Sequence, residues 1–193
     1  TRMKGSEAAD IINRSGARLL FTVGEFQTGP QSCIRYPELL REEQLPALEA
    51  TILFSGAAEN TVSWQTFLAK GDAIDSAQVE AAAARIDADD IMDMLFTSGT
   101  TGKPKGVMCA HEQNIRVVEA WADTVGLRDS DNYLIINPFF HSFGYKAGWL
   151  AALLKGATIF PVLSFDLDKV LKQISVDKIS MLPGPPTIYQ SIL

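Results

Sequence analysis

Residues 95–106 read Leu-Phe-Thr-Ser-Gly-Thr-Thr-Gly-Lys-Pro-Lys-Gly, directly after an apolar run that predicts a buried strand. From residue 97 onward the stretch holds four hydroxyls, three glycines and two lysines. Glycines let the backbone turn its N–H groups inward, which makes a concave site for anions. Lysines add point charges that can follow a polyphosphate as its charge changes. The loop therefore predicts a cradle for phosphate.

Two common phosphate-binding motifs do not match this loop. A Walker loop needs a glycine, four residues and then Gly-Lys-Ser/Thr, whereas Gly99 and Gly102 are only three apart here and Pro104 follows Lys103. This spacing also disfavours a kinase-like P-loop enzyme. The three spaced glycines of dinucleotide-binding folds are absent as well. The remaining alternative is a flexible surface loop with solvated lysines, and the ordered pattern of hydroxyls and glycines favours the cradle.

The rest of the chain alternates between helical and strand-like stretches. Apolar spacing predicts helices at 6–15, 64–68, 76–85, 114–124, 143–154, 166–174 and 186–193. Strands are predicted at 17–23, 50–54, 91–97, 132–137, 157–162 and 178–182, and the first of them is expected to be buried. Residues 24–49 are the most loop-like. Repeated strand–helix–strand units predict an α/β fold with largely parallel sheets covered by helices.

Composition excludes several classes of function. The chain has 193 residues, 47% of them hydrophobic, which is typical of a globular protein of one or two domains. Its 17 Lys and Arg against 23 Asp and Glu give a net charge of −6, which is unsuited to duplex nucleic acid. No apolar run is long enough to span a membrane, and the first residues lack the core of a signal peptide. Two cysteines without metal-ligand or disulfide spacing fit the reducing cytoplasm, where we expect the protein.

The loop resembles the signature motif of the adenylate-forming enzymes, which include acyl-CoA synthetases, adenylation domains of peptide synthetases and luciferase. The family pattern Ser-Gly-Thr-Thr-Gly, any residue, Pro-Lys-Gly is matched in full by residues 98–106. A second family motif, usually Pro-Leu-Phe-His, appears at residues 138–141 with Phe139 in place of Leu. The spacing between the motifs also fits, and the likeness extends over essentially the whole chain.

The resemblance implies a reaction in two steps. The carboxylate of an acid attacks the α-phosphorus of ATP, pyrophosphate leaves, and the thiol of coenzyme A then displaces AMP from the acyl-adenylate. Since two anions must meet, positive charge and oriented donors at the phosphates favour the first step. The resemblance carries ATP binding over to Thr97, Ser98, Gly99, Thr100, Thr101, Gly102, Lys103 and Lys105. Lys105 would also act in catalysis, as the main charge on the leaving pyrophosphate.

The second motif supplies the residues expected around the acid. His141 matches the family position beside the substrate carboxylate and the α-phosphate, where a neutral imidazole can donate a hydrogen bond; the alternative is a core histidine that caps the following helix. Phe143, Gly144 and Tyr145 are candidates to shape the acyl pocket, and the two aromatic residues could instead be ordinary core. Lys146 either reaches solvent or meets a polar group of the acid.

Other family elements have no match in this chain. The motif that holds Mg²⁺, the ribose-binding aspartate and the lysine of the C-terminal domain would lie beyond Leu193. We therefore expect residues 1–193 to be an internal fragment of the large AMP-binding domain, inactive alone, with no metal ligands of its own. Among relatives, the sequence looks most like bacterial ligases of steroid-ring propionate degradation. Transfer to a carrier-protein thiol and a non-catalytic nucleotide-binding remnant remain alternatives.

Overall fold

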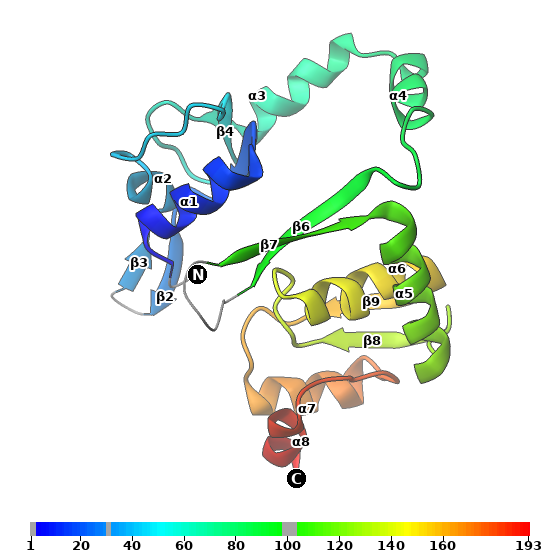
Figure 1. Cartoon of the computed structure of the whole chain (residues 1–193). Coiled ribbons are helices and arrows are strands. Elements are labelled where there is room, and N and C mark those ends of the chain that lie inside the picture. The colour runs from blue at the N-terminus through cyan, green and yellow to red at the C-terminus, as the bar shows by residue number, and fades with distance from the viewer. Residues whose placement is uncertain (1–2, 30–31, 98–103) are drawn as a thin grey trace. The chain divides into compact units, whose positions relative to one another are not determined.

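The computed structural model of the chain describes residues 3–29, 32–97 and 104–193, apart from the side chains of residues 28 and 29. Its helices and strands fall into two units, one made of residues 1–86 and 96–106 and the other of residues 87–95 and 107–193. Figure 1 follows the alternation of helices and strands along the chain. Three of the strand pairings described below are parallel, which confirms the predicted α/β fold class.

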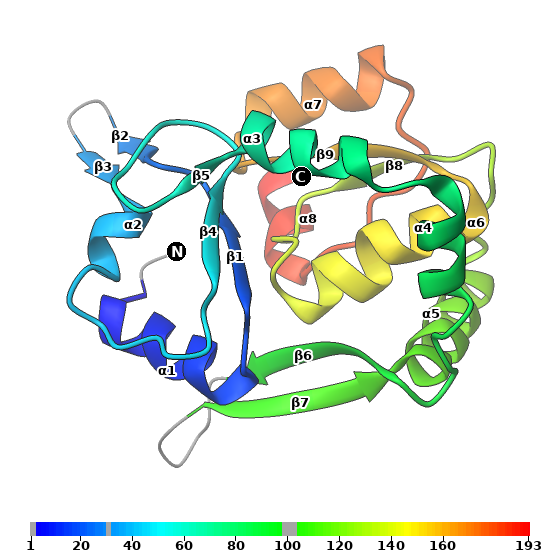
Figure 2. The ribbon, with the colours of Figure 1, turned by 90° about the horizontal axis from the view of Figure 1, so that it is seen from above.

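The first unit is built on a three-stranded parallel sheet. Strand β4 (Ala50–Leu53) lies between β1 (Leu19–Thr22) and β5 (Val62–Ser63), as Figure 2 shows. Helix α1 (Gly5–Ser15) precedes β1 and ends at Gly16, whose φ of 65° is a left-handed conformation that glycine adopts readily. The helices predicted after the sheet are present as α3 (Trp64–Ala69), continued by the 3₁₀ turn η1 (Lys70–Ala73), and α4 (Ser76–Ala83).

Two expectations for this unit were wrong. The loop-like stretch 24–49 contains the antiparallel strands β2 (Phe26–Gly29) and β3 (Ser32–Ile34) and the short helix α2 (Tyr36–Leu39). The predicted strand at 17–23 exists, but it is not buried, since Leu19 and Phe21 are 43% and 41% exposed. In this sheet β1 is an edge strand, while Ile52 and Leu53 of the central strand are buried.

Two paired strands flank the phosphate motif. Strand β6 (Ile91–Thr97) has the predicted bounds, although its inner residues are half-buried rather than buried. Strand β7 (Lys105–Ala110) pairs with β6, and the arrows of the two run in opposite directions in Figure 2. The sequence placed residues 105–106 in the loop. This boundary was wrong because strand pairing with β6 outweighs the glycine and proline signals nearby.

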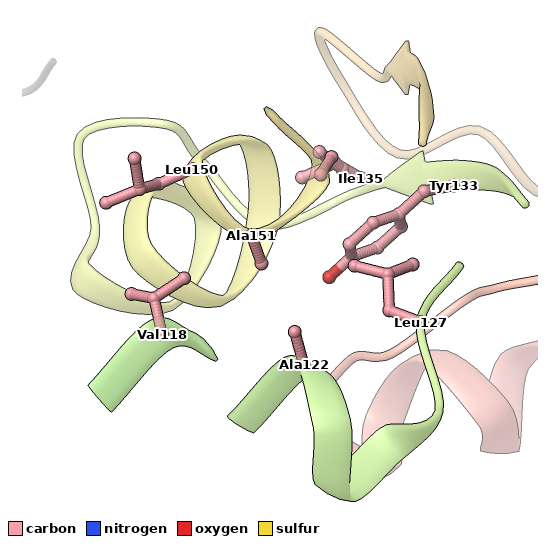
Figure 3. Packing of buried hydrophobic residues seen from close by; sticks show 8 residues of the cluster. Val118, Ala122, Leu127, Tyr133, Ile135, Leu150 and Ala151 are labelled. Atoms are coloured by element: carbon pink, nitrogen blue, oxygen red, sulfur yellow. The ribbon is translucent and has the colours of Figure 1, made fainter. Parts of the chain in front are cut away.

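The second unit packs helices against a small parallel sheet. Strands β8 (Asn132–Ile135) and β9 (Thr158–Pro161) pair in parallel. Against them lie α5 (His111–Val125), the π-helix η2 (Phe143–Leu150) and its continuation α6 (Ala151–Lys155). In Figure 3, Val118 and Ala122 point from α5 toward Leu150 and Ala151 on the facing helix. This core holds the helix that follows His141.

The chain ends with helices α7 (Leu167–Val176) and α8 (Pro186–Ile192), both as predicted. The strand expected at 178–182 was wrong, since this segment makes a single bridge between Met181 and Tyr133. Lys178 adopts a positive φ of 50°, which interrupts the extended backbone that a longer strand needs. Within the three described ranges, no helix combines the length and apolar character needed to cross a membrane.

Candidate active site

The structure describes the two ends of the predicted phosphate loop. Six of its predicted ATP-binding residues lie outside the described residues: Ser98, Gly99, Thr100, Thr101, Gly102 and Lys103. Thr97 ends β6 and Lys105 begins β7, and both are exposed. The hydroxyl of Thr97 donates to the carbonyl oxygen of Lys105 at 3.5 Å. Strand pairing therefore brings these two predicted ATP-binding residues together.

Arg14 in α1 holds the same two strand ends, and the sequence analysis missed it. Its guanidinium donates to the carbonyl oxygen of Pro104 at 2.7 Å and lies over the ring of Phe96, 5.2 Å from the centroid. Asp10, one turn earlier, orients it through an ion pair of 3.1 Å. Arginine near a helix end is common, so no local signal separates Arg14 from an ordinary surface residue.

We expect an Arg14→Met substitution in the full-length protein to weaken ATP binding. It removes a hydrogen bond from a charged donor, worth about 1.5 kcal/mol, next to the residues predicted to bind phosphate. The expected result is a KM for ATP about tenfold higher. Arg116→Met is the matched control, because the side chain of Arg116 is 76% exposed and pairs with Glu112 on the surface of α5. Equal KM values for the two variants in steady-state kinetics would contradict a role for Arg14.

His141 stands at the start of η2 and caps it. Its Nδ1 accepts a hydrogen bond from the backbone N–H of Phe143 at 3.2 Å, and the backbone N–H of His141 donates to the carbonyl oxygen of Pro138 at 3.0 Å. Because a neutral imidazole carries one proton, an accepting Nδ1 leaves the proton on Nε2. The side chain is exposed rather than part of the core. His141 therefore caps the helix and also presents an Nε2–H donor.

Gly144 allows the helix to start against the turn that carries His141. A Cβ at this position would lie 2.2 Å from the carbonyl oxygen of Pro138 and 2.5 Å from that of Asn137. Gly144 is buried, so it contributes close backbone packing. Its place beside an acyl pocket stays a prediction.

The two aromatic candidates make packing contacts inside the second unit. Phe143 meets Trp121 of α5 edge to face, with ring centroids 6.1 Å apart, and Tyr145 stacks on Trp149 at 4.7 Å. Burial, followed by the charge of Asp93, raises the pKa of Tyr145 to about 12. These contacts fit the interpretation of both rings as core, and their contribution to an acyl pocket stays a prediction.

The π-helix is stabilised from the sheet below it. The hydroxyl of Tyr133, which is 1% exposed, donates to the carbonyl oxygen of Ala147 at 2.7 Å. Burial raises the pKa of Tyr133, so the hydroxyl stays a donor. The next residue, Gly148, breaks helical geometry with φ −91° and ψ −106°. A π-helical turn of this kind is frequent at functional sites, and here it directly follows the predicted catalytic histidine.

Lys146 does not take the first of its two expected roles, and its contact with a polar group of the acid stays untested. Its Nζ lies 3.4 Å from Oδ1 of Asp93 on β6 and donates to Sγ of Cys109 on β7 at 3.2 Å. The side chain is 20% exposed, so it does not extend into solvent. Its charge is balanced by a carboxylate of the protein itself. This pairing joins residues far apart in the chain, which local sequence patterns do not reveal.

In the described part of the chain, no group of three or more His, Cys, Asp or Glu side chains is placed to hold a metal ion. Thr97 and Lys105 belong to the first unit, whereas His141 and the residues after it belong to the second.

The sequence matches the family described as AMP-binding enzyme over residues 1–193. Two curated relatives are named 3-[(3aS,4S,7aS)-7a-methyl-1,5-dioxo-octahydro-1H-inden-4-yl]propanoyl:CoA ligase. The one from Rhodococcus jostii (strain RHA1) is 43% identical and the one from Mycobacterium tuberculosis (strain ATCC 25618 / H37Rv) is 44% identical, each over 100% of this chain. The chain spans 38% and 37% of the lengths of these two relatives.

A solved structure supports the same fold. The inhibitor-bound N-terminal domain of FACL13 from Mycobacterium tuberculosis matches with a TM-score of 0.76 at 22% identity, over 100% of this chain and 44% of that domain. At this level of identity the match bears on the fold alone. The fold of this chain is thus also found in a solved protein structure.

Proposed function

Because the chain belongs to the AMP-binding enzyme family, we propose that the full-length protein is an acid–CoA ligase, which activates a carboxylic acid with ATP and transfers it to coenzyme A. The observation that carries this proposal is the similarity over the whole chain to two ligases named for the same acyl-CoA. We further propose that residues 1–193 are an internal part of the large AMP-binding domain, and that they do not turn over alone.

In the first step an oxygen of the carboxylate attacks the α-phosphorus of ATP. The bond between the α-phosphorus and the bridging oxygen breaks, pyrophosphate leaves, and an acyl-adenylate remains. The ε-ammonium of Lys105 stabilises the charge that develops on pyrophosphate. The hydroxyl of Thr97 has one proton, so it would turn from the carbonyl oxygen of Lys105 to donate to the same phosphates. The Nε2–H of His141 orients the carboxylate or an α-phosphate oxygen without adding a competing base. Exposure of all three side chains supports these roles.

In the second step the thiol of coenzyme A attacks the acyl carbon and AMP leaves, which gives the thioester. We propose that the acid carries a propanoate chain on a fused ring system with ketone groups, as the names of the two relatives specify. The apolar rings of Phe143 and Tyr145 would border such a ring system. We also propose that the Mg²⁺ required with ATP is held by residues beyond Leu193, and that the protein works in the cytoplasm.

The test is adenylate formation by the full-length protein. It is incubated with ATP, Mg²⁺ and a panel of acids that includes fused-ring propanoates and plain fatty acids, and acyl-AMP and acyl-CoA are measured by mass spectrometry. We expect one acid class to give acyl-AMP, and coenzyme A alone to convert it to a thioester. An acyl-AMP that coenzyme A does not convert to a thioester would indicate that the acceptor is a carrier-protein thiol. ATP binding without any acyl-AMP would indicate a non-catalytic role.

Lys105→Met is expected to lower the rate of adenylate formation about 100-fold, since it removes a charge that acts mainly in the transition state. The control is Lys172→Met, which changes an exposed lysine on α7. Both variants should melt at the temperature of the wild type, because both side chains are exposed. A Lys105→Met variant with the wild-type rate of ATP–pyrophosphate exchange would exclude this role for Lys105.

A further inference from the structure

We propose that the ion pair between Asp93 and Lys146 fixes the position of η2, the helix that follows His141, against strands β6 and β7. The inference rests on the proposed function, because it concerns the placement of the residues that would bind the acid. Lys146 itself does not touch the acid. It acts through the helix that carries it.

The pair lies at a point where four elements meet inside the second unit. Asp93 is on β6, and its side chain is 11% exposed. Its Oδ2 accepts a hydrogen bond from Nδ2 of Asn114 on α5 at 2.7 Å, and Asn114 is 2% exposed. Its Oδ1 faces Lys146 of η2 at 3.4 Å, and Lys146 also donates to Cys109 on β7. One cluster therefore connects two strands and two helices.

Such a cluster favours one position of the helix over its neighbours. Both charges have lost most of their water, so each needs the other to remain stable. A desolvated carboxylate and ammonium must keep their distance and direction, which adds to the hold of the packed core on the helix. Oδ1 of Asp93 faces Nζ of Lys146 at 3.4 Å, and the hydroxyl of Tyr145 on the same helix also interacts with this carboxyl group. A shift of η2 along β6 would separate the pair.

The position of η2 is passed on to His141 through rigid backbone. Gly144 brings the first turn of the helix against the carbonyl oxygens of Asn137 and Pro138. His141 makes hydrogen bonds to Pro138 in the turn before the helix and to Phe143 in the first turn of the helix. When the helix moves, the imidazole moves with it. A misplacement of about 1 Å in a reacting group can cost about 100-fold in rate.

The alternative role for Lys146 is recognition of a polar group on the acid. The structure argues against it, because Asp93 already balances the charge of the ammonium and Sγ of Cys109 accepts a hydrogen bond from it. If Lys146 recognised the acid, its substitution would lower kcat/KM only for acids that carry such a polar group. A positioning residue affects every acid that the protein activates.

The experiment compares three lysine variants of the full-length protein by ATP–pyrophosphate exchange, with a keto acid and a plain acid. For Lys146→Met we expect kcat/KM for both acids to fall about tenfold, with the KM for ATP within about twofold of the wild type. Lys146→Arg keeps a cation within reach of Asp93 and should restore most of the activity. Lys172→Met, on the exposed face of α7, should behave as the wild type.

A double variant, Asp93→Asn with Lys146→Met, separates positioning from stability. Lys146→Met alone leaves the carboxylate of Asp93 unpaired and should lower the melting temperature. The double variant has no unpaired charge, so we expect its melting temperature to lie closer to that of the wild type while its kcat/KM stays low. Recovery of both quantities together would overturn the proposal, as would a Lys146→Met defect confined to the keto acid. A wild-type protein that forms no adenylate refutes the proposed function, whereas an active wild type with an equally active Lys146→Met variant refutes this inference alone.

Discussion

A Gly144→Ala substitution should destabilise the full-length protein by about 2 kcal/mol and abolish most adenylate formation. The added Cβ would lie 2.2 Å from the carbonyl oxygen of Pro138, a distance that real Cβ atoms do not reach. The atoms in the way are backbone, so they cannot rotate aside as a side chain would. The turn at 138–141 or the helix must move, and His141 is displaced in either case. Thermal unfolding and acyl-AMP yield measure the two effects.

The matched control for this prediction is Gly71→Ala. Gly71 lies in η1, and a Cβ there would meet nothing within 4 Å. The same chemical change should therefore alter stability by less than about 0.5 kcal/mol and leave activity unchanged. If the Gly144→Ala variant has the melting temperature of the wild type and remains active, the backbone contact at the start of η2 does not position His141.

His141→Asn is expected to fold normally and to form adenylate about 100-fold more slowly. The oxygen of an asparagine side chain can take the place of Nδ1 and accept the N–H of Phe143, as asparagine often does at helix starts. Nothing then occupies the position of Nε2. The substitution keeps the cap and removes the donor, so a loss of rate without a loss of stability assigns the catalytic role to Nε2.

Two further variants complete this test. His141→Ala removes both functions and should add a loss of about 1 kcal/mol in stability, because the helix start loses its acceptor. His141→Gln places an amide N–H near the position of Nε2 and should keep more activity than the asparagine variant. If all three variants adenylate the acid as fast as the wild type, His141 is only a capping residue.

Local patterns were sufficient for most of the secondary structure. Periodicity placed α1, β6 and α5 within a few residues of their observed ends, because each has a clear apolar face or run. It failed for the hairpin of β2 and β3, which is short and irregular in register. It also failed at 178–182, where extended-looking residues make one bridge and a positive φ at Lys178 ends the pattern. Such details depend on what the neighbouring segment offers.

The sequence by itself determined the family and the fold class and predicted the phosphate loop, because these depend on residue types at fixed spacing along the chain. The tertiary structure alone decided that Arg14 holds Phe96 and Pro104, and that Lys146 pairs with Asp93. It also decided which nitrogen of His141 accepts a hydrogen bond. These contacts depend on how helices pack onto strands and how the backbone turns. The physical reason is that a side chain's partner is set by distance in space, which the order of residues along the chain does not specify.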